Sequence, residues 1–178
     1  MPPYLCGRAL KNNIFNQLQE CQGSVLGNAC SWLKTITESL MSDIQRLIDT
    51  AFPFVQNLLS EYGEFFPLTS AIANDDSITQ IGTYDGDERP ISDKLIANLK
   101  KALKAKQGDY KCVTIFYNVS VVIPLTGLKS DAIVVFAEAQ YEKNGYNIFY
   151  PYVLTKEKNL TIIEGAWKET IEKEIFLL

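Results

Sequence analysis

Histidine is absent from all 178 residues of this sequence. The imidazole of histidine ordinarily titrates near neutral pH, and it is the commonest general base and the commonest ligand of transition metals. Its absence excludes catalytic triads of the Ser-His and Cys-His types and zinc sites that contain histidine. No other motif with a strong chemical signature takes its place, so we expect neither a cofactor nor a metal site.

The sequence also has little of what membranes, nucleic acids or redox centres require. No apolar run comes near the ~18–20 residues that span a bilayer, and amide side chains interrupt residues 12–20, where a signal peptide would have its core. The four cysteines form no CxxC pair, which argues against a zinc or thioredoxin-like site. The formal net charge of −4 argues against nucleic acid or anionic membrane as partners. We expect a cytoplasmic protein with reduced thiols.

What is present is the composition of a folded protein, with 47% hydrophobic and 21% charged residues, at a length that suits one domain. Residues 1–40 differ from the remainder, because they hold three of the four cysteines and an amide-rich stretch. We therefore expect residues 1–40 to be an N-terminal extension and residues 41–178 to be a single domain. Met41 also resembles a natural chain start.

A helix is predicted after Met41. Ser42 and Gln45 have the spacing of a capping box, and apolar residues then recur every three or four positions as far as Tyr62. Gly63 stands where a C-terminal cap belongs. The apolar period also extends backward to Trp32, but one helix over 32–62 would be ~46 Å long. That is long for a domain of this size, whose radius of gyration is only ~14 Å. We therefore expect two helices with a break near residues 40–43.

Beyond this helix the sequence is rich in strands. Short loops between consecutive strands imply antiparallel pairing, and the fold class is α+β, with N-terminal helices packed on a mainly antiparallel sheet of about five strands. The alternation of apolar and polar residues is clearest in the strand at 113–123. We expect a strand at 78–84 and then a helix capped by Ser92, whose buried stripe is Leu95, Ile96, Leu99, Ala102 and Leu103. The expected elements that follow are strands at 113–123, 131–141, 146–154 and 160–164, with an Asn144-Gly145 turn, and a final helical turn containing Trp167 and Ile175.

Five short motifs follow one another along the chain, and they are Glu64-Phe65-Phe66-Pro67, Tyr84-Asp85-Gly86-Asp87-Glu88, Val119 to Pro124, Lys129 to Ile133 and Pro151-Tyr152. Together they resemble a family of small uncharacterised bacterial proteins with the pattern GEFYPFG, YDGDE, DVxVxxP, KSDAI and PY. The resemblance covers about residues 60–155, with departures at Leu68-Thr69 and at Glu138-Ala139, where Glu-His is common. It implies a domain start near Met41 and an order of elements, but no reaction, because no activity is established for that family.

An acidic turn is the most site-like motif in the sequence. Asp85, Asp87 and Glu88 place carboxylates close together on a predicted turn, and such groups can coordinate a hard cation through oxygen. The turn lacks the spacing of an EF-hand loop, so an ordinary solvated turn is the simpler interpretation. Both interpretations stay open, together with a role in contacting a protein partner.

Two further carboxylates are candidates. Adjacent residues on a strand point to opposite faces, so Lys129 and Ser130 are not expected to act as a base and a nucleophile. Asp131, which follows them, is expected to accept backbone N–H groups in the preceding turn. Glu138 is the one carboxylate on an otherwise apolar strand. If its face is buried, desolvation would raise its pKa, as in general acids, but a solvated position is the favoured expectation.

The last candidates belong to an aromatic hairpin. Tyr150 and Tyr152 share a strand face with Tyr146, and exposed tyrosines are typical of interaction hot spots, although aromatic residues are also simply good strand residues. One face of this strand should cover the helices, and the other should meet a partner or a second copy of the chain. Pro151 removes a backbone donor and disfavours edge-to-edge pairing.

These observations lead to two hypotheses of function. The preferred one is a non-catalytic cytoplasmic protein-binding domain of the immunity or regulatory type, and whether the chain is an enzyme is left open. The alternative is a small carboxylate-dependent hydrolase or isomerase, in which Glu138 and one of Asp85, Asp87 or Asp131 converge in a cleft. The candidate binding residues are Asp85, Asp87, Glu88, Asp131, Glu138, Tyr150 and Tyr152.

Overall fold

The computed structural model describes the backbone of residues 29–81, 91–124 and 126–177, with side chains from residue 43 onward. Contacts within the chain divide it into two units, Met1–Ile36 and Thr37–Leu178. Of the first unit the structure describes the backbone of residues 29–36, which is helical. All the described strands lie in the second unit. The expected division into residues 1–40 and 41–178 stays a prediction.

Helix α2 spans Ala29–Tyr62 without interruption, so the break expected near residues 40–43 is wrong. Ser42 and Gln45 lie inside the helix, and Gln45 donates its side-chain amide to Asp49 one turn later, at 2.7 Å. The Ser42–Gln45 spacing does not start a helix here, because the apolar period continues through these positions. A continuous helix also keeps the backbone hydrogen bonds that a break would lose. The helix ends at Gly63, whose φ of 84° and N–H bond to the Leu59 carbonyl, at 2.9 Å, match the predicted cap.

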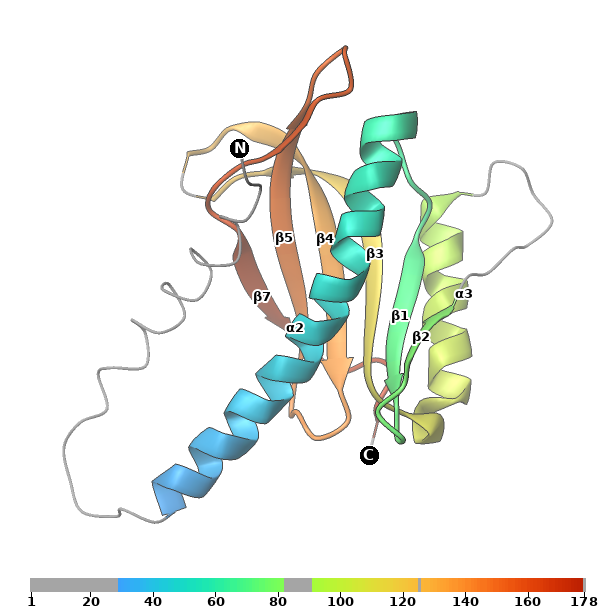
Figure 1. Ribbon diagram of the computed structural model, residues 1–178, viewed down its shortest axis with the longest axis vertical. Coiled ribbons are helices and arrows are strands. Elements are labelled where there is room, and N and C mark those ends of the chain that lie inside the picture. Colours follow the sequence, from blue (N-terminus) through green and yellow to red (C-terminus); the bar gives the residue numbers. More distant parts are fainter. Residues whose placement is uncertain (1–28, 82–90, 125, 178) are drawn as a thin grey trace. The chain divides into compact units, whose positions relative to one another are not determined.

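The strands form one antiparallel sheet in the order β2-β1-β3-β4-β5-β6, with β7 paired to β5, and the sheet curls as a half-barrel (Figure 1). The predicted α+β class is confirmed, although the sheet has seven strands within the described residues and not about five. The strands are β1 (Leu68–Ala73), β2 (Ile78–Ile81), β3 (Tyr110–Val122), β4 (Lys129–Ala139), β5 (Gly145–Leu154), β6 (Leu160–Ile162) and β7 (Trp167–Ile171).

Strand β7 replaces the helical turn that was expected at the end of the chain. Trp167 and Ile171 are four residues apart, a spacing that puts two side chains on one face of either a helix or a strand. Pairing with β5 decides between the two, because Trp167 lies opposite Phe149 and Ile171 lies opposite Gly145. The aromatic rings of Phe149 and Trp167 stack at 4.8 Å between centroids.

Helices cover both faces of the sheet (Figure 1). One cluster of buried side chains joins α2 to the face that carries Phe116 and Val135, and a second joins α3 (Ser92–Ala105) to the face that carries Ile115 and Phe136. Because successive strand residues point to opposite faces, the centres of β3 and β4 are buried on both sides. Each large buried side chain contributes about 1.5–3 kcal/mol.

Helix α3 buries three of the five residues of its predicted apolar stripe, while Ile96 is half-buried and Ala102 is exposed, and its predicted cap is wrong. Leu95, Leu99 and Leu103 are buried, as their spacing requires. Ile91 occupies the N-cap position, and Ser92 is the first helical residue and caps nothing through its side chain. Among the residues that the structure describes, no helix combines the length and the apolar character needed to cross a membrane.

Candidate functional site

Glu138 is fully buried on β4, so its expected solvated position is wrong. Its carboxylate accepts three backbone hydrogen bonds from the C-terminal segment, residues 172–177. Oε1 accepts the N–H of Glu174 at 2.7 Å, and Oε2 accepts those of Ile175 and Phe176 at 3.1 Å each. A buried carboxylate is tolerated only where such donors replace water. The acidic residue in the apolar strand is therefore an anchor for this segment.

The neighbouring strand makes room for the Glu138 side chain. A Cβ atom on Gly145 would lie 3.0 Å from Cγ of Glu138 and 3.1 Å from Cγ1 of Ile171. Gly145 was expected to serve the Asn144-Gly145 turn, but it is the first residue of β5 and is not among the glycines with positive φ. Glycine is needed here for space, since any side chain would push against the anchor.

Other contacts hold the same C-terminal segment in place. Lys173 donates to the Gln140 carbonyl at 3.0 Å, and burial lowers the pKa of its ammonium although Glu138 attracts the charge. Lys100 of α3 pairs with Glu174 at 2.7 Å. Ile175 is completely buried against α3 and the sheet. With both oxygens of Glu138 bound and no exposed surface, this carboxylate has no route to a substrate.

Asp131 is not brought near Glu138. The two lie seven residues apart on one strand, which separates them by roughly 23 Å and puts their side chains on opposite faces. Known pairs of catalytic carboxylates lie within about 5–9.5 Å. The Asp131 carboxylate accepts a hydrogen bond of 2.7 Å from the hydroxyl of Ser120 on the neighbouring strand β3. This hydroxyl takes the place of the backbone donors that were expected. Asp85, Asp87 and Glu88 lie outside the described residues.

Tyr150 and Tyr152 are core residues, with 6% and 4% of their surfaces exposed. Both pack in the cluster that joins α2 to the sheet, where the Tyr150 ring lies 4.8 Å from that of Phe52. The Tyr152 hydroxyl donates to Asn118 at 3.1 Å, and burial raises the pKa of this phenol. The aromatic face expected to meet either the helices or a partner therefore meets α2. These two rings have almost no surface to offer a partner.

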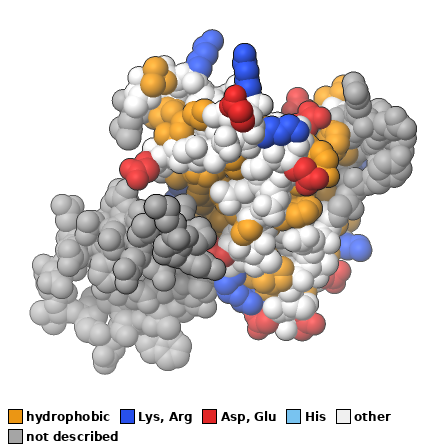
Figure 2. Space-filling model, turned by 45° about the horizontal axis from the view of Figure 1, so that its top comes forward, with side chains coloured by type: hydrophobic (Ala, Val, Ile, Leu, Met, Phe, Trp, Pro, Cys, Tyr) orange, Lys and Arg blue, Asp and Glu red, His pale blue; other side chains and the backbone are white. Residues whose placement is uncertain are grey.

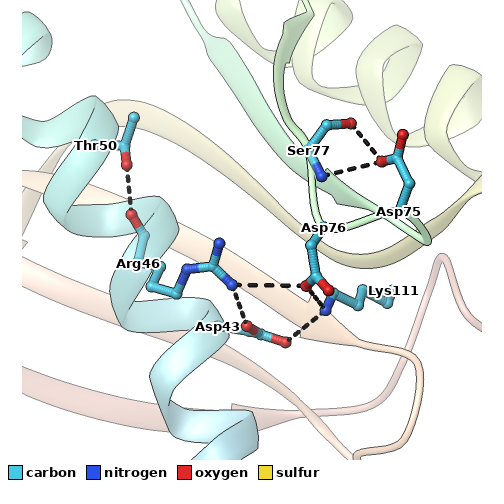
Figure 3. A network of polar contacts seen from close by, with 7 residues as sticks. All are labelled: Asp43, Arg46, Thr50, Asp75, Asp76, Ser77 and Lys111. Atoms are coloured by element: carbon cyan, nitrogen blue, oxygen red, sulfur yellow. Dashed lines mark hydrogen bonds and ion pairs between the residues drawn. The ribbon is translucent and has the colours of Figure 1, made fainter.

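A network of charged residues joins α2 to the β1–β2 turn and to the start of β3 (Figure 3). Arg46 contacts Asp43 at 3.0 Å and Asp76 at 3.8 Å, while Lys111 contacts both carboxylates. The Lys111 ammonium lowers the pKa of Asp76, and Asp76 raises that of Lys111. Two carboxylates and two cationic side chains neutralise each other here, so the network links α2 to the sheet. The described residues contain no group of three or more His, Cys, Asp or Glu side chains that could hold a metal ion.

The structure also contains a feature that was not predicted, an apolar groove of about 380 Å³ at the C-terminal end of α2. Three large aromatic side chains on it are unusually exposed, at 49% for Phe54, 61% for Tyr62 and 50% for Phe66. We call it the aromatic groove. Its lining residues are Phe54, Leu58, Tyr62, Glu64, Phe65, Phe66, Pro67 and Leu68.

Local structure explains how the aromatic groove forms. Phe54, Leu58 and Tyr62 recur every four residues on α2, one position before the buried residues Val55 and Leu59, so they form a second apolar stripe beside the core stripe. The left-handed Gly63 then ends the helix and turns residues 64–67 back toward β1. Figure 2 shows this end of the second unit turned forward, with hydrophobic side chains reaching the surface in patches between charged ones.

A second, shallower hollow of about 370 Å³ lies between α3 and the C-terminal segment. Asp93, Ile96, Ala97, Lys100 and Glu174 line it. Two of its charged side chains, Lys100 and Glu174, form an ion pair with each other and so are not free to bind a ligand. The aromatic groove is therefore the stronger candidate for a binding site.

Comparisons of this chain with models of protein families, with curated proteins and with solved structures found no match. The family resemblance described from the motifs stays a prediction.

Proposed function

We propose that this chain is a non-catalytic protein-binding domain of the immunity or regulatory type, that it works in the cytoplasm, and that it binds its partner through the aromatic groove. The observation that carries the proposal is the exposure of Phe54, Tyr62 and Phe66 around one apolar hollow. Exposed, contiguous apolar surface marks interaction sites. Aromatic side chains are enriched among the residues that dominate binding energy.

The backbone under these aromatic side chains supports the proposal. Phe54 and Tyr62 stand on a continuous helix, and Phe66 follows a glycine cap that fixes the direction of the chain. Phe65, which is only 8% exposed, packs into the core and so fixes the position of residues 64–67, which link α2 to β1. A surface that is already ordered loses little conformational entropy when a partner binds. Immunity proteins, which are small, acidic and without catalytic motifs, offer an analogy.

The alternative, a carboxylate-dependent hydrolase or isomerase, receives less support. It requires Glu138 to face a cleft, whereas three backbone N–H groups occupy its two oxygens. Asp131 is too distant to form a pair with it. A binding role therefore agrees better with the surface that the chain presents.

Site-specific photo-crosslinking tests the proposed function. A photoreactive amino acid at position 66 should capture a defined protein in cells that naturally express this chain. The same amino acid at Tyr141, which is 72% exposed in the β4–β5 turn, is the matched control. The captured protein must then bind the purified chain directly, and Phe54→Ser must weaken that binding. Identical labelling at positions 66 and 141, or no labelling at either, would contradict the proposal.

A further inference from the structure

We infer that the aromatic groove binds a cationic segment of a protein partner, in which a lysine or arginine side chain stands beside an apolar anchor residue. This inference rests on the proposed function, because it specifies the partner for the same surface. The apolar lining provides a site for the anchor, and the charges around the groove select the cation.

Two acidic side chains lie at the aromatic groove. Glu64 is the charged residue among those that line it. The Glu61 carboxylate lies next to the Tyr62 hydroxyl, and this contact raises the pKa of the phenol. The groove also adjoins the C-terminal end of α2, where the helix dipole is negative. The last turn itself holds no basic residue, and Lys158, which donates to the Glu61 carbonyl, offsets part of this dipole.

The segment that forms the groove contains no residue that could neutralise this charge. Between Arg46 and Arg89 the sequence has eight aspartate and glutamate residues and not one lysine or arginine. From elsewhere in the chain, Lys158 reaches this end of α2, where it donates to the backbone carbonyl of Glu61. The carboxylates of Glu61 and Glu64 are exposed and can pair with a cation that a partner supplies.

The aromatic faces favour the same kind of ligand. A lysine or arginine over an aromatic ring is attracted by the negative face of the ring. Among the described residues this contact already occurs three times. The ammonium lies 4.3 Å from the ring centroid for Lys100 and Phe136, 4.4 Å for Lys168 and Tyr146, and 5.6 Å for Lys173 and Phe176. Phe54 and Phe66 present half of their surfaces to solvent and can offer comparable faces to a partner's cation.

Fluorescence anisotropy with three sets of short labelled peptides tests the inference. All sets share a central Leu-x-x-Phe core, flanked by lysine in the first, glutamine in the second and glutamate in the third. The lysine set should bind roughly tenfold more tightly than the glutamine set, as expected for a few solvated charge contacts, and added salt should reduce this advantage. The glutamate set should bind more weakly than either.

Variants of the purified chain assign the binding to particular residues. Phe54→Ser with Phe66→Ser should abolish binding of the lysine set, and Glu61→Gln with Glu64→Gln should reduce it to the level of the glutamine set. The matched control, Asp109→Asn with Glu172→Gln, removes two exposed carboxylates elsewhere and should change nothing. Circular dichroism of each variant establishes that it is folded.

Other outcomes overturn the inference in distinguishable ways. If all three sets bind equally well, and the phenylalanine variant abolishes this binding, the groove binds proteins but does not select a cation. If no set binds while position 66 still crosslinks to a partner, the cationic segment is wrong and the proposed function stands. If the wild-type chain is a dimer and the phenylalanine variant a monomer, the groove is occupied by a second copy of the chain.

Discussion

Removing the Glu138 carboxylate should release the C-terminal segment from the sheet. Glu138→Ala takes away the acceptor of three backbone N–H groups and leaves a cavity between β4 and β5. A hydrogen bond to a charged group contributes about 1.5–3 kcal/mol, but three such losses do not add, because a detached segment regains its hydrogen bonds from water. The cost is then limited by the burial lost at Ile175 and Phe176, about 1.5–3 kcal/mol each.

We therefore expect Glu138→Ala to lower the free energy of unfolding by about 3–5 kcal/mol, which is a large share of the 5–15 kcal/mol typical of a domain. Urea unfolding followed by circular dichroism measures this change, and hydrogen exchange should show the amides of residues 174–176 losing protection. Glu172→Ala, an exposed change in the same segment, should stay within about 0.5 kcal/mol of the wild type.

A double-mutant cycle with Gly145 sharpens the prediction. Gly145→Ala should destabilise the wild type by about 1–3 kcal/mol, because the new Cβ meets Cγ of Glu138 at 3.0 Å. In the Glu138→Ala background that contact is gone, so the same change should cost at least ~1 kcal/mol less. A loss below ~1 kcal/mol for Glu138→Ala, with protection of residues 174–176 unchanged, would refute the anchor role.

Three further predictions follow from buried or paired side chains. Tyr150→Ser with Tyr152→Ser should cost at least ~4 kcal/mol in urea unfolding, because both rings are core residues, whereas a mild effect would mean that they are not. Burial raises the pKa of the Cys112 thiol to about 12. In a variant whose other cysteines are replaced, Cys112 should therefore resist thiol reagents until the protein unfolds. The free energy of unfolding should also fall as pH rises above the ordinary thiol pKa of about 8.5–9, because the thiol of the unfolded chain ionises first. Asp76→Asn should reduce stability at neutral pH by removing a partner of Lys111. Because Lys111 lowers the pKa of Asp76, this difference should disappear as acid titration protonates the carboxylate, and a difference that persists in acid would contradict the ion-pair explanation.

The sequence was most informative where local periodicity and tertiary burial agree. Strand β3 was anticipated from alternating apolar residues, and the buried leucines of α3 from their spacing. Strand β1 was missed because Thr69 and Ser70 are small and polar, and their complete burial depends on pairing with β3, more than forty residues later. The start of α2 was misplaced because a capping box is a local signal, and the continuing apolar stripe outweighs it.

The candidate site was harder to predict because its parts come together only in three dimensions. The position of Glu138 in an apolar strand was recognised, but its burial depends on backbone donors from a segment almost forty residues away. The aromatic groove left a weak signal, the second stripe of Phe54, Leu58 and Tyr62 beside the core stripe. The apolar period that predicted the helix runs through Leu58 and Tyr62 without separating them from the core stripe, because periodicity alone cannot tell how wide a face the sheet will cover.

The most direct test of the central claim is the affinity of the crosslinked partner, once purified, for variants of the aromatic groove. Isothermal titration calorimetry should give a dissociation constant for Phe54→Ser with Phe66→Ser that is weaker than that of the wild type by a factor of roughly 30 or more, as for hot-spot residues. The control, Tyr141→Ser with Val153→Ser, changes two residues exposed elsewhere and should leave the affinity unchanged. Equal affinities for the groove variant and the wild type would contradict the account.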